Sequence, residues 1–333
     1  MSFVDTIETL CKSNKLPNQA TKTFLGFCAC YKAACEKAQI DPNTCVDVFK
    51  TFLHCVAKEL QDPYTFGPYH RAIRAPVDYY TLGLDFVRPL IDYTHSMVLG
   101  KQSLAAINLA IQNKENVVLL SNHQTEIDPQ IISLLIENEY PKLACDMIFV
   151  AGHRVISDPL AIPFSLGRNL ICIYSKRHID TPPEKKAEKI SHNQKAMKCL
   201  EYLLQEGGKC IYIAPSGGRD RVNDKGEPEV SPFDPQSVEM LYLLSQKARH
   251  PTHFYTLALS TYPLLPPPNQ VLTEIGETRT TYYSPAHLVF GERIDMEHIG
   301  QCHEESDKKQ KRIIRTDAIW QQVVADYQSI SNT

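Results

Sequence analysis

The feature that most constrains this chain is a series of short apolar runs that alternate with helical stretches. Each run is short and apolar throughout, as strands are when both faces of their sheet are covered. The runs lie at Val117–Leu120, Met147–Ala151, Leu170–Tyr174, Cys210–Ala214 and Phe254–Leu259. Strands of this kind, separated by helices, predict an α/β fold with a mixed, mostly parallel sheet flanked by helices.

Helical periodicity fills much of the remaining chain. It covers Leu104–Gln112, Pro129–Ile136, Glu184–Gln205 and Lys308–Ser329. Apolar residues also recur at helical spacing before residue 62, and a stretch rich in Pro, Gly and Tyr follows at residues 62–78. We therefore expect a small N-terminal helical bundle domain over residues 1–77 and an α/β catalytic domain over residues 78–333.

Composition excludes several classes of protein. The 35 basic and 38 acidic residues give a formal charge of −3, whereas a dedicated nucleic-acid binder usually carries a basic excess. No apolar run approaches the roughly 20 residues that a membrane-spanning helix needs, and the N-terminal residues lack the pattern of a secretory signal. The 11 cysteines form no CxxC pair, which favours a reducing compartment over a disulfide framework. We expect a soluble intracellular protein.

The sharpest candidate site follows the first apolar run, in the segment SNHQTEIDP. His123 lies on the loop after the predicted strand, and Asp128 is placed to N-cap the next helix with Pro129 at its first position. The loop is long enough for Asp128 to accept a hydrogen bond from Nδ1 of His123, which would leave Nε2 as a base. Alternatively, Asp128 only caps the helix and His123 is an ordinary loop residue. These residues alone do not decide between the two interpretations.

A second candidate site follows the run at 210–214. Ser216, Gly217 and Gly218 precede Arg219 and Arg221. Paired glycines let a backbone approach a ligand closely, and two arginines one residue apart can converge on an anion. The alternative is a glycine turn with solvated arginines.

A third group of polar residues, which includes Arg177 and His178, follows the run at 170–174 in the segment YSKRH. In an open α/β sheet such segments meet at the carboxyl edge of the strands. A basic pocket in a slightly acidic protein indicates an anionic small molecule or an acidic protein partner. A charged helix face over residues 185–198 accounts for part of the local basic excess, but not for Arg177, Arg219 or Arg221.

Together these segments resemble the glycerolipid acyltransferase superfamily, whose hallmark is the NHx4D motif, here Asn122, His123 and Asp128. More narrowly, the chain resembles the soluble, plastid-type glycerol-3-phosphate acyltransferases of plant plastids and chlamydia-like bacteria. The narrower resemblance rests on SNHQTEIDP, YSKRH, IYIAPSGGRDR and LALSTYPLLPPPNQVLTEIGE. It covers most of the chain, including the helical N-terminal region.

The resemblance implies a glycerol-3-phosphate 1-O-acyltransferase. Such an enzyme transfers a fatty acyl group from an acyl carrier protein or coenzyme A thioester to the sn-1 hydroxyl of glycerol 3-phosphate, the first step of phospholipid synthesis. His123 would be the general base, oriented by Asp128. The residues implied for binding the substrate phosphate are Arg177, His178, Arg219 and Arg221, and those implied for the supporting loops are Asn122, Ser216, Gly217 and Gly218. The family has Lys at the position of Arg177.

The resemblance also sets expectations about partners and compartment. No cofactor, metal or nucleic acid is expected, and transient contact with a membrane surface stays open. The protein would be cytoplasmic in a bacterium, or stromal in a plastid if it is a processed plant protein. The apolar stretch at residues 155–174, with Leu160 and Phe164, is a candidate acyl-chain groove together with nearby residues of the helical domain.

Three other functions stay open at the level of sequence. The first is acyl transfer to lysophosphatidate or dihydroxyacetone phosphate. The second is thioesterase-like hydrolysis, in which His123 and Asp128 activate water. The third is the binding of a phosphorylated metabolite without turnover.

Overall fold

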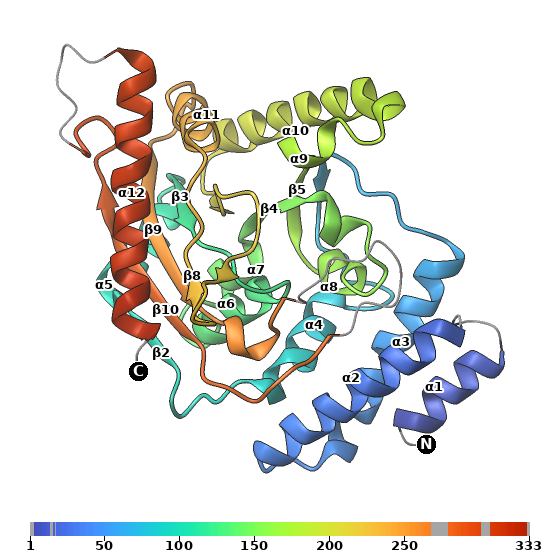
Figure 1. The fold of residues 1–333 in the computed structure, drawn as a ribbon. Coiled ribbons are helices and arrows are strands. Elements are labelled where there is room, and N and C mark those ends of the chain that lie inside the picture. Colours follow the sequence, from blue (N-terminus) through green and yellow to red (C-terminus); the bar gives the residue numbers. More distant parts are fainter. Residues whose placement is uncertain (1–2, 14–15, 17, 268–278, 301–306, 332–333) are drawn as a thin grey trace.

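In the computed structural model of the chain, residues 3–13, 16, 18–267, 279–300 and 307–331 are described. At the centre lies an eight-stranded sheet with the strand order β1-β5-β4-β6-β3-β9-β10-β2 (Figure 1). The strands are β1 (Tyr69–His70), β2 (Met97–Leu99), β3 (Asn116–Ser121), β4 (Ile148–Gly152), β5 (Asn169–Ile173), β6 (Cys210–Ile213), β9 (Thr252–Ser260) and β10 (His287–Ile294).

The five strands from β5 to β9 run parallel to one another, which confirms the predicted mostly parallel sheet. All six residues of β3, at the centre, are buried. The sheet is mixed because β1 pairs antiparallel with β5 and β10 pairs antiparallel with β9. Neither β1 nor β2 was predicted, since two or three residues are too few to show a period of two.

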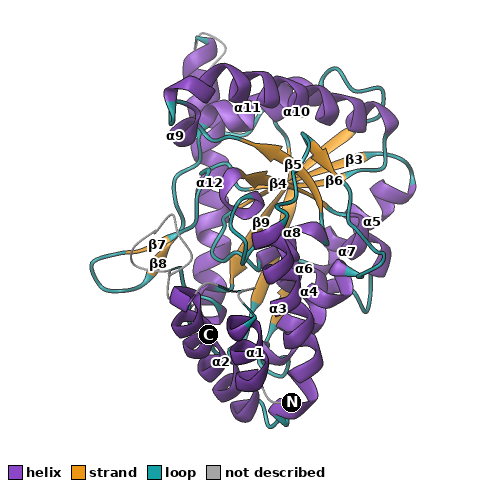
Figure 2. Ribbon diagram, turned by 90° about the vertical axis from the view of Figure 1, so that its right-hand side faces the viewer, coloured by secondary structure: helices purple, strands orange, loops and turns teal. Residues whose placement is uncertain are grey.

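Helices cover both faces of the sheet, as predicted (Figure 2). Val117 and Leu119 of β3 join the core beneath one set of helices, while Val118 and Leu120 join the core beneath another. The first set is α5 (Lys101–Gln112), α6 (Asp128–Ile136) and α7 (Pro141–Asp146). The second set is α10 (Lys186–Glu206), α11 (Pro235–Ser245) and α12 (Lys308–Ser331). This alternation follows from the opposite directions of successive side chains in a strand.

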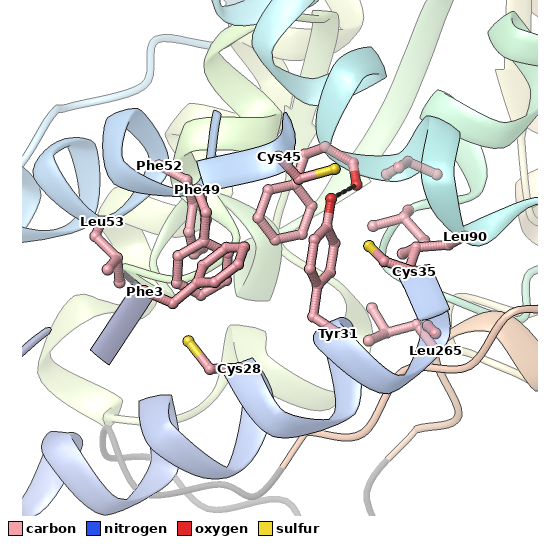
Figure 3. Close-up of a cluster of buried hydrophobic side chains, with 14 of the residues drawn as sticks. Phe3, Cys28, Tyr31, Cys35, Cys45, Phe49, Phe52, Leu53, Leu90 and Leu265 are labelled. Atoms are coloured by element: carbon pink, nitrogen blue, oxygen red, sulfur yellow. Dashed lines mark hydrogen bonds between the residues drawn. The ribbon is translucent and has the colours of Figure 1, made fainter. Parts of the chain in front are cut away.

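The N-terminal region is helical, as predicted. It contains α1 (Phe3–Lys12), α2 (Asn18–Lys37), the 3₁₀ turn η1 (Pro42–Cys45) and α3 (Val46–Gln61), and it packs against α4 (Tyr79–Val87). Phe3, Tyr31 and Phe49 lie in its core (Figure 3), where the Tyr31 hydroxyl donates a 2.9 Å hydrogen bond to the Phe86 carbonyl. One buried cluster thus contains residues from both sides of the predicted domain boundary between residues 77 and 78. The boundary itself stays a prediction.

Short elements complete the described part of the chain. They are η2 (Arg88–Leu90), η3 (His153–Ile156), α8 (Ile162–Leu166), α9 (Lys176–Ile179), η4 (Pro183–Lys185), η5 (Tyr262–Leu264) and the ribbon of β7 (Arg221–Val222) with β8 (Pro228–Glu229). None of the helices in the described ranges combines the length and the apolar character that crossing a bilayer requires.

Candidate active site

The candidate site lies where the parallel strands end. His123 follows β3, Arg154 follows β4, His178 follows β5 and Arg219 follows β6, while Thr261 follows β9. Because these strands are parallel, their carboxyl ends share one edge of the sheet, which is where open α/β sheets place their ligands. The sequence prediction that the candidate segments meet at one edge is confirmed.

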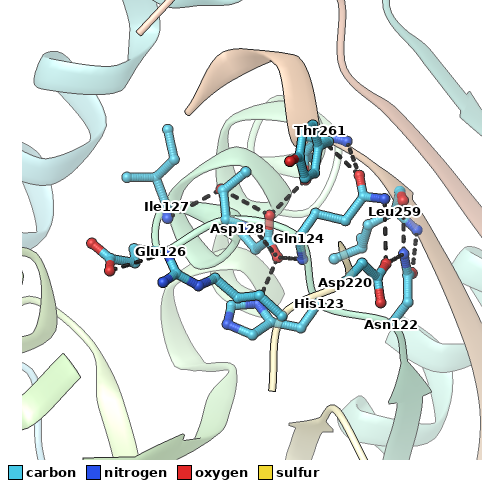
Figure 4. Close-up of polar contacts among 12 residues, drawn as sticks. Asn122, His123, Gln124, Glu126, Ile127, Asp128, Asp220, Leu259 and Thr261 are labelled. Atoms are coloured by element: carbon cyan, nitrogen blue, oxygen red, sulfur yellow. Dashed lines mark hydrogen bonds and ion pairs between the residues drawn. The ribbon is translucent and has the colours of Figure 1, made fainter. Parts of the chain in front are cut away.

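His123 and Asp128 make the predicted contact, with 2.8 Å between Nδ1 of the imidazole and Oδ2 of the carboxylate (Figure 4). Asp128 is completely buried. Its Oδ2 also accepts hydrogen bonds from the backbone N–H groups of Gln124 at 2.8 Å and Thr125 at 3.1 Å. Its Oδ1 accepts hydrogen bonds from the hydroxyls of Thr125 at 3.0 Å and Thr261 at 2.6 Å.

These donors keep Asp128 ionised. Burial alone would raise the pKa of this carboxyl, but the hydrogen bonds from His123, Thr261 and Gln124 outweigh burial, and the pKa falls below its ordinary value. An ionised carboxylate can only accept hydrogen bonds, so Nδ1 of His123 carries the proton. Nε2 is then the nitrogen that can take a proton from a substrate.

Asp128 is not the N-cap that the sequence predicted. Helix α6 begins at Asp128 itself, and Ile127 is its N-cap residue without a capping side chain. The reason is that the Asp128 carboxylate faces back toward the loop, where His123, Gln124 and Thr125 donate to it, and not forward to the first turn of the helix. Pro129 is consequently the second residue of the helix and not, as predicted, the first, although it still lies in the first turn.

Asn122 connects the loop after β3 to two other segments. Its Nδ2 donates to Asp220 Oδ2 at 2.9 Å and to the Leu259 carbonyl at 3.0 Å, and its Oδ1 accepts from the Leu259 N–H at 2.8 Å. The backbone N–H of Asp220 donates to the His123 carbonyl at 2.6 Å. The loop that carries His123 is therefore hydrogen-bonded to the loop that carries Arg219 and Asp220.

Gln124 extends this network, although it was not predicted as a site residue. Its Oε1 accepts from the backbone N–H groups of Thr261 at 2.7 Å and Tyr262 at 2.9 Å, and its Nε2 donates to Asp220 at 3.3 Å. Both Gln124 and Asp220 are completely buried. These contacts fix the end of β9 against the candidate site.

Asp220 was also missed, although the sequence carried a signal for it. An acidic residue between Arg219 and Arg221 would repel an anion unless its side chain pointed elsewhere. It does point elsewhere, toward Asn122, and the Ser231 N–H donates to its other oxygen at 3.0 Å. Burial raises the pKa of Asp220 to about 6, although these hydrogen bonds oppose the rise.

Glu126 gathers three arginines from three distant segments. Its carboxylate lies 3.2 Å from Nη1 of Arg219, 3.1 Å from Nη2 of Arg279 and 3.5 Å from Nε of Arg154. The side chains of Glu126 and Arg219 are each 8% exposed. The NHx4D segment includes Glu126 without indicating its partners. Arg279 is separated from it by about half of the chain, so no local pattern could have linked the two.

Charge within this group shifts two pKa values. Burial lowers the pKa of Arg219, Glu126 opposes that effect, and the nearby Arg154, Arg221 and Arg279 lower it further. Burial alone would raise the pKa of Glu126, but its three arginine partners outweigh burial and hold the pKa below its usual range. Glu126 therefore stays ionised among the arginines.

The other predicted phosphate ligands are less closely gathered. Arg221 is exposed on β7, near enough to Arg219 to repel it. His178 is exposed on α9 and influences the pKa of His153 instead, and within the described residues no hydrogen bond or ion pair joins His178 to Arg219 or Arg221. The Arg177 side chain lies outside the described part of the structure.

A glycine turn lies between Ser216 and Arg219, as in the alternative interpretation of this segment, but the Arg219 side chain is buried and not solvated. Gly217 has a φ of +67°, which favours glycine, and the Ser216 hydroxyl donates to the Gly218 carbonyl at 2.9 Å. This turn places Arg219 back toward the loop of His123.

The segment that carries these residues is similar in sequence to known proteins. A family model described as "Acyltransferase" matches residues 101–260, which run from α5 through β9 and include His123, Asp128, Arg219 and Arg221. Residues 101–260 of the chain therefore form an acyltransferase-family domain.

Three relatives of the chain are named chloroplastic glycerol-3-phosphate acyltransferases. The chain is 45% identical to one from Cucurbita moschata over 75% of this chain and 54% of the relative. The identity is 42% to one from Arabidopsis thaliana, over 75% of this chain and 55% of that protein. The identity is 39% to one from Phaseolus vulgaris, over 81% of this chain and 58% of that protein. The chain spans about half the length of the curated relatives that it matches.

An apolar cavity adjoins the candidate site. It is about 50 Å³ in volume, and its walls come from the N-terminal helices, α4, α8 and the loop of His123. Phe24, Phe27 and Phe52 contribute from the N-terminal helices, and the predicted groove residues Leu160 and Phe164 also line it. Glu126 and Arg279 lie in its wall as well, so the cavity borders the arginine cluster.

The last segment of the resemblance, LALSTYPLLPPPNQVLTEIGE, runs into residues 268–278, which lie outside the described residues. Within the described ranges, no three His, Cys, Asp or Glu side chains form a group that could hold a metal ion.

Proposed function

We propose that this chain catalyses 1-O-acylation of glycerol 3-phosphate with a fatty acyl thioester. The observation that carries the proposal is the His123–Asp128 pair, whose loop is hydrogen-bonded to the loop of Arg219 through the Asp220 N–H. An oriented base therefore lies beside a cation-rich loop. The names of the chloroplastic relatives support the same substrate.

The chemistry follows from these groups. Nε2 of His123 removes the proton from the sn-1 hydroxyl as that oxygen attacks the thioester carbonyl, and a C–O bond forms. Ionised Asp128 stabilises the imidazolium that results. The tetrahedral intermediate then collapses with cleavage of the C–S bond, and the departing thiolate takes the proton from the imidazolium. His123 ends in its starting state, and the products are 1-acyl-glycerol 3-phosphate and a free thiol.

The arginines supply the positioning. A phosphate held by Arg219 and Arg221 would fix the acceptor, so that its hydroxyl is presented to His123 at attack distance, and such fixation lowers the entropic part of the barrier. Arg177 and His178 stay candidates for the outer side of this pocket. The supporting roles of Asn122 and of Ser216, Gly217 and Gly218 are, in this proposal, to hold the two loops.

The donor and compartment belong to the same proposal. A thioester already carries the activated acyl group, so the reaction needs no cofactor or metal. The donor is the thioester of acyl carrier protein or of coenzyme A, and the apolar cavity beside Glu126 receives the start of its acyl chain. The chloroplastic relatives favour the plastid stroma over a bacterial cytoplasm as the compartment.

The deciding experiment detects the product directly. Purified protein is incubated with glycerol 3-phosphate and palmitoyl thioester, on acyl carrier protein and on coenzyme A in separate reactions, and 1-acyl-glycerol 3-phosphate is measured by mass spectrometry. We expect product from the wild type and none from His123→Ala. His95→Ala is the matched control, because His95 makes the same 2.8 Å contact with Asp92 on an exposed surface.

Each other outcome favours a different function. Free fatty acid without acylated acceptor would favour hydrolysis. Product from lysophosphatidate or dihydroxyacetone phosphate alone would change the acceptor. Retained turnover in His123→Ala would contradict the assignment of the base.

The phosphate ligands have a separate test. Arg219→Ala and Arg221→Ala should each raise the KM for glycerol 3-phosphate about 10- to 100-fold, because each loses charge-assisted hydrogen bonds worth about 1.5–3 kcal/mol. Steady-state kinetics with glycerol 3-phosphate varied at saturating donor measures this change. An unchanged KM in both variants would refute the assignment of these arginines.

A further inference from the structure

Glu126 has more arginine partners than a simple structural ion pair requires. One buried carboxylate faces Arg219, Arg279 and Arg154, which come from the loop after β6, the segment before β10 and η3. Asp158 adds a second carboxylate, 2.5 Å from Nη2 of Arg279. Three guanidinium groups thus share two carboxylates, so the group as a whole keeps one positive charge.

The position of Glu126 in the chain indicates a function for this group of charges. Glu126 follows His123 by three residues, and Gln124, Thr125 and Asp128 between and beside them are buried and hydrogen-bonded. The loop is therefore held in one conformation at both residues. Glu126 reaches Arg219 from the same loop that presents His123.

A small acceptor imposes a fixed distance between its phosphate and its reacting hydroxyl. The base and the phosphate anchor must therefore be held in a constant relation, and a displacement of about 1 Å is costly. Arg219 lies on a glycine-containing turn and has a long side chain, so its guanidinium needs an external restraint. The pair between Nη1 of Arg219 and Oε1 of Glu126 supplies one.

We propose that Glu126 is a positioning residue that fixes the Arg219 guanidinium relative to His123 for the substrate phosphate. This inference rests on the proposed function, because it assumes that Arg219 binds the phosphate of glycerol 3-phosphate. Glu126 acts through Arg219 and does not touch the reacting atoms. Arg279 and Arg154 complete the positive surroundings that keep Glu126 ionised.

Glu126→Gln tests the proposal, because it keeps the size of the side chain and removes its charge. We expect the KM for glycerol 3-phosphate to rise about 10-fold or more, as for the loss of one charge-assisted hydrogen bond. The kcat at saturating acceptor and the KM for the acyl donor should stay within about threefold. Calorimetric titration with glycerol 3-phosphate should show the same loss of affinity without requiring turnover.

Two variants serve as controls. Asp158→Asn removes a charge from the same network, but that charge is paired with Arg279. The variant should therefore leave the KM for glycerol 3-phosphate nearly unchanged. Glu137→Gln breaks the 2.7 Å pair with Arg88 at a partly exposed position outside the network and should also have no effect. If Glu126→Gln does not fold, as judged by circular dichroism, Glu126→Asp is measured instead.

A double mutant separates positioning from a general structural effect. If Glu126 acts through Arg219, adding Glu126→Gln to Arg219→Ala should leave kcat/KM for glycerol 3-phosphate within about twofold of the Arg219→Ala value. Independent, multiplicative losses would overturn the proposal. So would an unchanged affinity in Glu126→Gln. Absence of lysophosphatidate from the wild type would refute the proposed function instead, while the calorimetric comparison would still decide the role of Glu126.

Discussion

At the scale of single residues, Asp128 differs from an ordinary ion-paired carboxylate. Four donors besides His123 bind its two oxygens, and two of them are backbone N–H groups that converge on Oδ2. The side chain is therefore held in one orientation even if its charge is removed. This allows the charge of Asp128 to be tested separately from its geometry.

We expect Asp128→Asn to lower kcat by about 100-fold or more with little change in substrate affinity. The asparagine carbonyl would take the place of Oδ2, since two backbone N–H groups require an acceptor there, and would still accept from Nδ1 of His123. Only the charge that stabilises the imidazolium is lost. Steady-state kinetics of the variant measures this loss, and Asp92→Asn beside the exposed His95 is its control. A kcat within a few-fold of the wild type would contradict the role of the carboxylate.

Asp220 predicts a dependence of stability on pH. Its pKa is about 6 in the folded protein against 3.8 without burial, so the folded state binds a proton more tightly than the unfolded state. Its contribution to stability is complete below about pH 4 and is lost as the pH rises through 6. The shift corresponds to an amount on the order of 3 kcal/mol.

Urea denaturation of the wild type and Asp220→Asn at pH 4 and pH 7 measures this effect. The free energy of unfolding of the variant, relative to that of the wild type, should rise by roughly 3 kcal/mol between these values, since asparagine does not titrate. Histidines and other carboxyls cancel in the comparison. A constant difference across this range would show that the pKa of Asp220 is not raised.

The sequence predicted the part of the site that is local. His123 and Asp128 are five residues apart, and the loop between them can close in few ways. The prediction failed for contacts that depend on the tertiary fold, such as those of Glu126 with Arg279 and of Gln124 with the end of β9. The sequence correctly predicted the contact of Asp128 with His123, but Asp128 is not the helix N-cap that it also predicted, because the donors to its carboxylate lie upstream in the loop.

At the scale of elements, strand prediction succeeded where both faces of a strand are covered. All five predicted strands are present, and their bounds differ by at most two residues from the predicted ones. Strand β10 was missed because only its first four residues, His287–Phe290, are buried as a run, while Gly291, Glu292 and Arg293 follow. Its pairing with β9 is irregular between Phe290 and Arg293. A strand with such an interruption shows neither a continuous apolar run nor a regular alternation.

Helix α8 and the segment before it give a prediction about the cavity. At about 50 Å³, the cavity is smaller than the engineered cavity of about 150 Å³ that admits benzene, so an acyl chain must displace its lining. Phe164 lines it and packs against Phe52 and Phe86. The size of the Phe164 side chain should therefore limit which acyl chains enter the cavity.

Phe164→Ala and Leu160→Ala should shift the ratio of kcat/KM values toward longer acyl donors by roughly 10-fold, on the scale of discrimination by one or a few methylenes. Competition between donors of different chain length, read by mass spectrometry, measures the ratio. Phe254→Ala, in the core on the opposite side of the sheet, controls for general loosening. An unaltered ratio in both cavity variants would argue that the acyl chain binds elsewhere.

At the scale of the whole molecule, aromatic rings join the N-terminal helices to the rest. Phe27, Phe49 and Phe52 of α2 and α3 pack against Phe86 of α4, with ring centroids 4.9–6.1 Å apart. The hydroxyl of Tyr31 adds one buried hydrogen bond across this junction. The junction is therefore part of the core and contributes to the stability of both sides.

Tyr31→Phe should lower the free energy of unfolding by about 1–2 kcal/mol, because it leaves a buried carbonyl without this donor. Thermal or urea denaturation measures the change, and Tyr202→Phe, on a residue that is 65% exposed, is the control. Equal free energies of unfolding of the two variants would contradict a stabilising role for the hydrogen bond from Tyr31 to the Phe86 carbonyl.

The contact between Thr261 and Asp128 also determines when the site can form during synthesis. The two residues are separated by 133 positions in the chain. A nascent polypeptide that has emerged only as far as β6 already carries His123, Asp128 and Glu126. It still lacks β9 and the groups of Thr261 and Tyr262 that bind Asp128 and Gln124. Long-range pairing of this kind forms late. We therefore expect the complete set of hydrogen bonds around His123 and Asp128 to form only after strand β9 has been made, so a fragment that ends before β9 should lack the proposed activity.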